Sequence, residues 1–201
     1  MRLLSVCRLD RNEQYKGVDQ VIEALPAVSL QVPDVQYFVV GGGTDIERHK
    51  QLAVEVGVAD RVHFLGFVDD LTLRACYQTC DIFVMPSGGE GFGFVFLEAM
   101  QNGKPVVAAN SGGAPEVVQD SVTGALVEYG DVAQLAETLV RLCLDPSSRA
   151  RMGQAGYERL HQHFNFPRFK QTLIDILSRE LPADVLYNAR RRTLFDAQQI
   201  V

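Results

Sequence analysis

The sequence has no excess of positive charge and no long hydrophobic run. Nineteen Lys and Arg stand against 25 Asp and Glu, a formal net charge of −6, so no global positive field exists to hold nucleic acid or anionic lipid. No apolar segment approaches the roughly 20 residues of a membrane span, and the N-terminus lacks the features of a signal peptide. We therefore expect no nucleic-acid partner and a cytoplasmic location, with the inner face of a membrane left open.

Cysteine is sparse and scattered. Cys7, Cys76, Cys80 and Cys143 include no pair at zinc-ligand spacing, so we expect reduced thiols and no metal site. Cys76 and Cys80 lie four residues apart on an expected helix, and we interpret them as small buried hydrophobes.

Several familiar catalytic motifs are missing as well. The sequence contains neither the Gly-Lys-Ser/Thr of a P-loop, nor the His-Glu-x-x-His of a metalloprotease, nor a Gly-x-Ser-x-Gly elbow. The run Gly41–Gly43 suggests a dinucleotide-binding loop, but Ile46 occupies the position of its third glycine. The match to that motif is therefore weak.

What is present is an alternation of short apolar runs with segments of helical periodicity. With 47% hydrophobic and 22% charged residues, the chain is typical of a globular protein with a sizeable core. Strands buried on both faces are typical of a parallel sheet covered by helices. The sequence therefore predicts a doubly wound, Rossmann-like parallel α/β sheet with C-terminal helices. The expected strands are residues 3–7, 35–40, 61–65, 81–85, 105–108 and 124–127, and the last three helices are 131–143, 145–161 and 166–181.

The C-terminal tail is set apart from this domain. We assign residues 1–181 to one domain with its C-terminal helices and 182–201 to a tail. Because Arg190–Arg192 lie among apolar residues, the tail is either a partner-docking amphipathic helix or a frayed terminus.

A glycine-rich loop, residues 86–93, leads into a helix that is apolar nearly all round and carries a single charge, Glu98. Such a helix is expected to be buried, so Glu98 requires an ion pair, a ligand or a water-filled cleft. Glu90 precedes it by eight residues, which separates the two carboxylates by up to about 12 Å along a helix axis. Glu90 alone could be an acid stabilised by the helix dipole. Together the two acids suit an elongated ligand with a diol at each end and phosphate between, as in a nucleotide sugar.

Two cations follow the first expected strand. Arg8 and Lys16 flank a polar loop at the strand's carboxyl end, where open α/β sheets bind their ligands. Both could reach a diphosphate there, although each taken singly could equally be a solvated surface side chain.

Several short blocks follow one another in an order and spacing that chance does not explain: residues 8–10 with 16–17, 39–41, 61–68, 86–87 with 90–93, 98–100 and 112–116. In these blocks the chain resembles the C-terminal, donor-binding half of GT-B-fold retaining glycosyltransferases of the group 1, or family 4, type, which include sucrose synthases and bacterial mannosyltransferases. The resemblance runs from residue 3 to about 166. Two departures fall in the loop that would bind phosphate: Cys7 stands where the family usually has glycine, and the stretch from Arg8 to Gly17 is slightly longer than common.

The resemblance implies a role for each matching position. Arg8 and Lys16 would hold the donor diphosphate, Glu90 would face the transferred sugar, and Glu98 would bind the ribose hydroxyls. The implied reaction is transfer of a hexose with retention, without a metal or cofactor, because cations and helix N-termini neutralise the leaving diphosphate. The remaining donor-binding positions are Gly91, Phe92 and Gly93 at the sugar or phosphate, Phe67 and Val68 at the base, and Gly42 at the end of the second strand.

The resemblance also implies a partner. A GT-B enzyme has an N-terminal domain that binds the acceptor, here a sugar, a lipid or another small molecule, and this chain starts at the first donor-domain strand. We therefore expect that domain in a longer protein or in a separate subunit. The alternatives are a non-catalytic nucleotide-sugar-binding subunit and a GT-B sugar-nucleotide epimerase.

Overall fold

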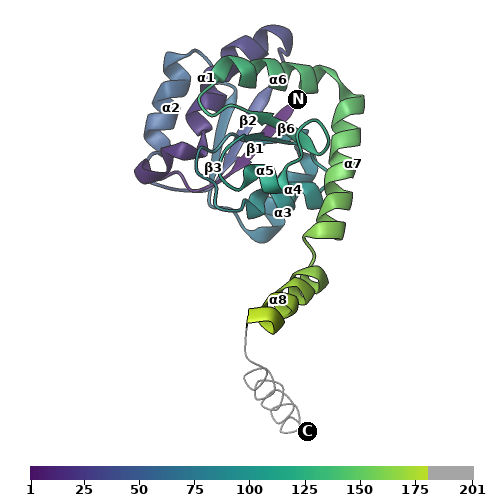
Figure 1. Ribbon diagram of the computed structural model, residues 1–201. Coiled ribbons are helices and arrows are strands. Elements are labelled where there is room, and N and C mark those ends of the chain that lie inside the picture. Colours follow the sequence, from purple (N-terminus) through teal and green to yellow (C-terminus); the bar gives the residue numbers. More distant parts are fainter. Residues whose placement is uncertain (181–201) are drawn as a thin grey trace. The chain divides into compact units, whose positions relative to one another are not determined.

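The computed structural model describes residues 1–180 (Figure 1). The predicted tail, 182–201, lies outside the described residues. The chain divides into two units, Met1–Leu160 and a second unit from His161 onward. The first unit therefore ends inside the region that the sequence analysis assigned to one domain.

The first unit is built on a six-stranded parallel sheet. Its strands run in the order β3-β2-β1-β4-β5-β6, so β1 is central and the chain crosses over between β3 and β4. This confirms the predicted doubly wound sheet. The strands are β1 (Arg2–Val6), β2 (Gln36–Val40), β3 (Val62–Gly66), β4 (Ile82–Met85), β5 (Val106–Ala109) and β6 (Gly124–Val127).

Helices cover both faces of this sheet. Helices α1, α2 and α6 lie on one face and α3, α4 and α5 on the other (Figure 1). All residues of β4 and β5 are buried, which explains why these strands are wholly apolar. The helices of this unit are α1 (Val18–Gln31), α2 (Ile46–Glu55), α3 (Asp70–Thr79), α4 (Phe94–Gln101), α5 (Ala114–Val117), α6 (Val132–Leu144) and α7 (Pro146–His163), the last ending just past the unit boundary.

Helices α5 and α7 begin at residues that are typical of a helix N-terminus. Pro115 lies in the first turn of α5, and Pro146 is the first residue of α7. Asp145 accepts a hydrogen bond from the Ser148 amide at 2.9 Å, so it caps α7. The polar stretch after β1, expected to be a loop, contains a short 3-10 helix, η1 (Arg11–Lys16), with no buried residue.

The second unit contains α8 (Phe166–Glu180). Its bounds agree with the predicted helix 166–181, and none of its residues is buried. It exposes the large apolar side chains Phe166, Phe169, Leu173, Ile174, Ile176 and Leu177.

Candidate functional site

The loops that follow β1 and β4 meet at the carboxyl edge of the sheet. The Gly88 amide donates to the Tyr15 carbonyl at 2.8 Å. Gly17 has a φ of +81°, and a Cβ there would lie 2.4 Å from the Pro86 carbonyl oxygen. Only glycine permits both the left-handed backbone and this close approach. The two loops are therefore held together by main-chain contacts.

A third loop, which follows β5, is hydrogen-bonded to the loop that follows β4. The Gly113 amide donates to the Glu90 carbonyl at 2.7 Å, and the Ser111 hydroxyl donates to the Gly88 carbonyl at 2.8 Å. A Cβ on Gly112 would lie 2.4 Å from the Glu90 carbonyl oxygen. We call residues 7–17, 86–93 and 110–113 the loop cluster.

Lys16 and Glu90 form an ion pair inside the loop cluster. Lys16 Nζ donates to Glu90 Oε2 at 2.8 Å, and the two side chains are only 16% and 14% exposed. The structure thus joins two predicted site residues that are 74 positions apart. A pair this well shielded is screened little by salt and holds both groups at the sheet edge.

Arg8 is paired with a carboxylate that the sequence analysis missed. Its guanidinium donates to Glu13 Oε1; the Arg8 side chain is 71% exposed, whereas Glu13 is 12% exposed. The second oxygen, Glu13 Oε2, is buried and has no hydrogen-bond partner within residues 1–180. The only sign of Glu13 in the sequence is its position, five residues after Arg8 in the polar loop that Arg8 and Lys16 flank.

Cys7 also lies in the loop cluster, where the resemblance leads us to expect glycine. Burial raises the pKa of its thiol to about 12, against the opposing charge of Lys16. The thiol therefore stays protonated at neutral pH. Its carbonyl oxygen lies 1.9 Å from where a Cβ of Gly41 would be, so the first two strand ends also touch through main chain.

The backbone turns sharply where the loop cluster enters α4. Gly93 precedes the helix with a φ of +87°, and a Cβ there would collide with the Phe96 ring at 2.3 Å. Gly91 is exposed. The rings of Phe92 and Phe94 meet edge to face, with centroids 5.2 Å apart. The three predicted positions from Gly91 to Gly93 thus surround the N-terminus of α4, where amide groups favour an anion.

Glu98 faces a cleft, which corrects one expectation. Helix α4 is not buried all round: Phe96, Ala99 and Met100 are buried, whereas Phe94 and Glu98 are exposed. The apolar surface that indicated a core helix belongs in part to the wall of a cleft.

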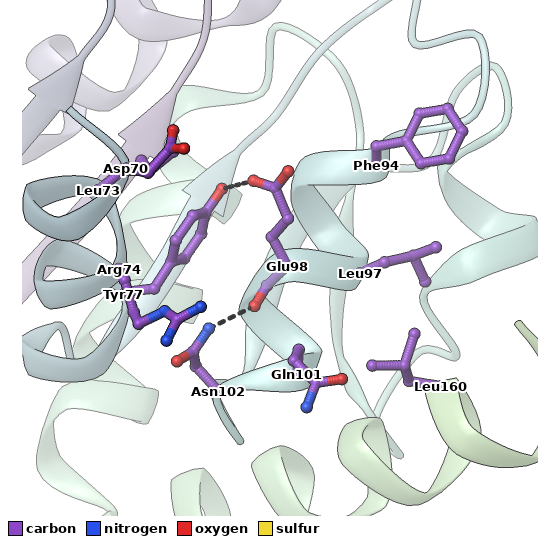
Figure 2. A pocket seen from close by; sticks show the side chains of 10 residues that line it. All are labelled: Asp70, Leu73, Arg74, Tyr77, Phe94, Leu97, Glu98, Gln101, Asn102 and Leu160. Atoms are coloured by element: carbon purple, nitrogen blue, oxygen red, sulfur yellow. Dashed lines mark hydrogen bonds between the residues drawn. The ribbon is translucent and has the colours of Figure 1, made fainter. Parts of the chain in front are cut away.

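This cleft has a volume of about 480 Å³ and lies between α3 and α4 (Figure 2). Tyr77 of α3 donates from its hydroxyl to Glu98 Oε2 at 2.7 Å. Tyr77 is not predictable from the sequence, because a tyrosine on an amphipathic helix gives no sign of a functional contact. The cleft is lined by Asp70, Leu73, Arg74, Tyr77, Phe94, Leu97, Glu98, Gln101, Asn102 and Leu160.

The predicted base-contact residues, Phe67 and Val68, follow the carboxyl end of β3, and the predicted donor-binding residue Gly42 follows that of β2. The Phe67 side chain is 84% exposed, and its ring lies over Gly42, where a Cβ would be 2.3 Å from a ring carbon. Val68 is partly buried. Phe67 and Gly42 are therefore neighbours, and the glycine is needed for the ring to lie as it does.

A network of charged side chains supports the loop cluster from α2. Arg48 contacts Asp45 at 2.6 Å and Asp19 at 2.9 Å, and His49 Nδ1 lies 2.6 Å from Asp19. Asp45 also accepts a hydrogen bond from Gln14 of η1 at 3.1 Å. The hydrogen bond from Arg48 lowers the pKa of the Asp45 carboxyl, although burial opposes it.

Residues 1–180 contain no group of three His, Cys, Asp or Glu side chains arranged to hold a metal ion. Among the described helices, none has both the length and the apolar character to cross a membrane. The four cysteines, all within this range, are free thiols.

Known glycosyltransferases are similar to this chain in sequence. The chain is 38% identical over 179 residues to the GDP-mannose-dependent alpha-(1-6)-phosphatidylinositol monomannoside mannosyltransferase of Mycobacterium tuberculosis, covering 86% of this chain and 46% of that protein. It is 37% identical over 159 residues to the D-inositol 3-phosphate glycosyltransferase of Corynebacterium efficiens, covering 76% and 38%. The chain thus spans less than half the length of these curated relatives.

Solved structures of glycosyltransferases have a similar fold. Anabaena Alr3699/HepE in complex with UDP and glucose superposes with a TM-score of 0.78 at 30% identity, over 89% of this chain and 48% of that one. The C-terminal domain of the Francisella tularensis group 1 glycosyl transferase LpcC superposes with a TM-score of 0.73 at 29% identity, over 82% and 87%. The family described as glycosyl transferases group 1 matches residues 3–159. By sequence and by fold, this chain belongs to that family and corresponds to the C-terminal half of a GT-B glycosyltransferase.

Proposed function

We propose that this chain is the donor-binding half of a nucleotide-sugar-dependent glycosyltransferase that transfers a hexose with retention. The observation that carries the proposal is the shielded Lys16–Glu90 pair in the loops that precede α4, the helix whose Glu98 lines the cleft. The pair sets a cation and a carboxylate at the carboxyl edge of the sheet, where nucleotides bind in folds of this class. The acceptor would be bound by an N-terminal domain, supplied by a longer protein or by a separate subunit.

The proposed chemistry uses the charges that the loop cluster already holds. Arg8 and Lys16 would bind the diphosphate and offset the negative charge that develops on it as the glycosidic bond breaks. When Lys16 moves to a phosphate oxygen, the Glu90 carboxylate becomes free to accept a hydroxyl of the transferred sugar. Attack from the face that the diphosphate leaves would give retention without an enzymic nucleophile. The two cations and the N-terminus of α4 would then replace a metal ion.

We propose GDP-mannose as the first donor to test. The M. tuberculosis relative is named for GDP-mannose, and its identity to this chain exceeds that of the Anabaena structure with UDP. That relative is also named for a phosphatidylinositol monomannoside. An acceptor of this class would place the protein in the cytoplasm at the inner face of a membrane.

Calorimetric titration of the chain with GDP, UDP, ADP and their mannose or glucose conjugates tests donor binding. Glu98→Ala and the double variant Arg8→Ala, Lys16→Ala should each weaken the preferred nucleotide. Glu137→Ala and Arg141→Ala, both at exposed positions of α6, serve as controls that remove one negative or one positive charge, and neither should weaken binding. Absence of binding by the folded chain at millimolar nucleotide would contradict the proposal.

Transfer is tested by joining this chain to an N-terminal half. The N-terminal half of the M. tuberculosis relative, fused ahead of residue 1, should restore mannosyl transfer from GDP-mannose, and the anomeric NMR signal of the product should show retention. Hydrolysis or epimerisation of the donor without transfer would favour a different reaction on the same fold.

A further inference from the structure

Tyr77 lines the cleft, but its ring is packed against the aromatic side chains of the core. The residue is only 3% exposed, and its ring stacks on Phe83 of β4 with the ring centroids 5.7 Å apart. Phe83 in turn meets Phe96 of α4 edge to face at 6.1 Å. The phenol is therefore fixed by aromatic contacts from the sheet, while α4, which carries Glu98, packs on the same aromatic group.

From this fixed position the phenol reaches a single acceptor. Its hydroxyl donates to Glu98 Oε2 at 2.7 Å (Figure 2). Burial, followed by the hydrogen bond to Glu98, raises the pKa of Tyr77 far above its usual value, so the hydroxyl is protonated and able to donate at neutral pH. An ionised carboxylate only accepts hydrogen bonds, so the direction of this bond is fixed.

The bond leaves most of the Glu98 carboxylate available. Within residues 1–180, Tyr77 is the only side chain that hydrogen-bonds to this carboxylate, and the second oxygen points away from the phenol (Figure 2). A carboxylate has about four lone-pair sites, of which the phenol takes one. The remaining sites border a cleft large enough for a nucleoside.

We propose that Tyr77 is a positioning residue, which holds the Glu98 carboxylate in the one orientation that accepts both hydroxyls of a ribose. This inference rests on the proposed function, because it assumes that the cleft binds the nucleoside of the donor. A glutamate has three rotatable side-chain bonds, and ordering them on binding would weaken the ligand's hold. The phenol orders them before the ligand arrives.

The test compares GDP with 2′,3′-dideoxy-GDP, which lacks both ribose hydroxyls, or the uridine pair if UDP is the tighter ligand. Tyr77→Phe should weaken GDP roughly 5- to 10-fold, somewhat less than the worth of a hydrogen bond to a charged group, because the phenol acts through Glu98 and not on the ligand itself, and it should leave dideoxy-GDP unchanged. In Glu98→Ala the two ligands should bind alike, and adding Tyr77→Phe should change neither. Tyr37→Phe is the matched control: it also removes a buried hydroxyl, hydrogen-bonded to Ser5 at 2.7 Å, but it lies in β2.

A measurement without ligand accompanies the titration. The ¹³Cζ signal of Tyr77, assigned by its disappearance in Tyr77→Phe, should shift in Glu98→Ala and stay in place in Glu137→Ala. Equal weakening of both nucleotides by Tyr77→Phe, or an unshifted Cζ signal, would overturn the positioning role while leaving the proposed function intact. Failure of the unsubstituted chain to bind any nucleotide would overturn the ribose assignment together with the proposed function.

Discussion

The two parts of the candidate site differ in how much of their charge is already paired. In the loop cluster, Lys16 contacts Glu90 and Arg8 contacts Glu13, so each cation has a carboxylate partner. In the α3–α4 cleft, the Glu98 carboxylate has one neutral partner, Tyr77, and faces about 480 Å³ of space. A diphosphate entering the loop cluster must replace existing ion pairs, whereas a nucleoside entering the cleft fills space that is already present.

This difference separates the two sources of donor affinity. In the loop cluster, phosphate replaces a carboxylate as the partner of a cation. The net binding free energy is therefore the difference between two ion-paired states, and the released carboxylate needs another partner or water. In the cleft, hydroxyl groups add hydrogen bonds without removing any. Removing the carboxylate that pairs with a cation should therefore either strengthen or weaken nucleotide binding, whereas removing Glu98 should only weaken it.

The largest expected effect comes from the main-chain contacts of the loop cluster. Gly17→Ala places a methyl group 2.4 Å from the Pro86 carbonyl oxygen at a φ of +81°, and we expect a loss of at least about 3 kcal/mol in the free energy of unfolding, with loss of nucleotide binding. Gly57 is the matched control, with a φ of +76° and no atom within 4 Å. Gly57→Ala should cost only about 1 kcal/mol. Urea unfolding of both variants measures the difference, and equal losses would show that the loops can separate.

The second effect tests the shielded pair directly. Lys16→Ala leaves the Glu90 carboxylate without its partner, and we expect GDP to bind roughly 10- to 100-fold more weakly while guanosine, which has no phosphate, binds unchanged. Stability should fall by about 1 to 3 kcal/mol.

The double variant Lys16→Ala, Glu90→Gln separates these two losses. Stability should return, because the unpaired charge is gone, but GDP affinity should not. Recovery of GDP affinity would mean that Lys16 serves the fold and not the phosphate.

Much of the loop cluster can be predicted from the sequence, because it depends on topology. Short apolar runs predict parallel strands, and the carboxyl ends of parallel strands meet at one edge. Together these two rules place Arg8, Lys16 and Glu90 at one edge of the sheet. The pairing itself could not be predicted, since it depends on how closely Gly17 lets the first loop approach Pro86.

The cleft was harder to predict for a related reason. Helix α4 carries apolar residues on nearly all of its sides, and hydrophobicity alone does not distinguish a side chain in the core from one on the wall of a ligand cleft. Phe94 therefore indicated a buried helix, although it is exposed. Tyr77 shows no pattern of its own, and its role emerges only from its distance to Glu98.

The third effect concerns the network that supports the loop cluster. The pKa of Asp45 is lowered by the hydrogen bond from Arg48, so ionised Asp45 stabilises the fold above the unfolded pKa of about 3.9, and this contribution is lost as the pH falls through the lower folded value. Asp45→Asn should cost about 1 to 2 kcal/mol at pH 7 and flatten the loss of stability below about pH 4. Urea unfolding at pH 7 and pH 3 checks both.

Asp34 is the control for this pH dependence. Its pKa is also lowered, in this case by the hydrogen bond from the N-terminal amine, but its side chain is 78% exposed. Asp34→Asn should leave stability unchanged at both pH values. If Asp34→Asn and Asp45→Asn behave alike, burial of the network contributes nothing.

The smallest expected effect is opposite in sign to the others. Glu13→Gln removes the carboxylate that now holds Arg8 and that adds negative charge beside the phosphate position, so GDP should bind roughly two- to fivefold more tightly, with guanosine unchanged. Glu47→Gln is the control, because Glu47 also pairs with a cation, Lys50, at 2.7 Å but is 84% exposed; it should alter neither ligand. Weaker GDP binding in Glu13→Gln would show that Glu13 aims Arg8 at the phosphate. The loop cluster would then resemble the cleft, with a fixed partner orienting the group that meets the ligand.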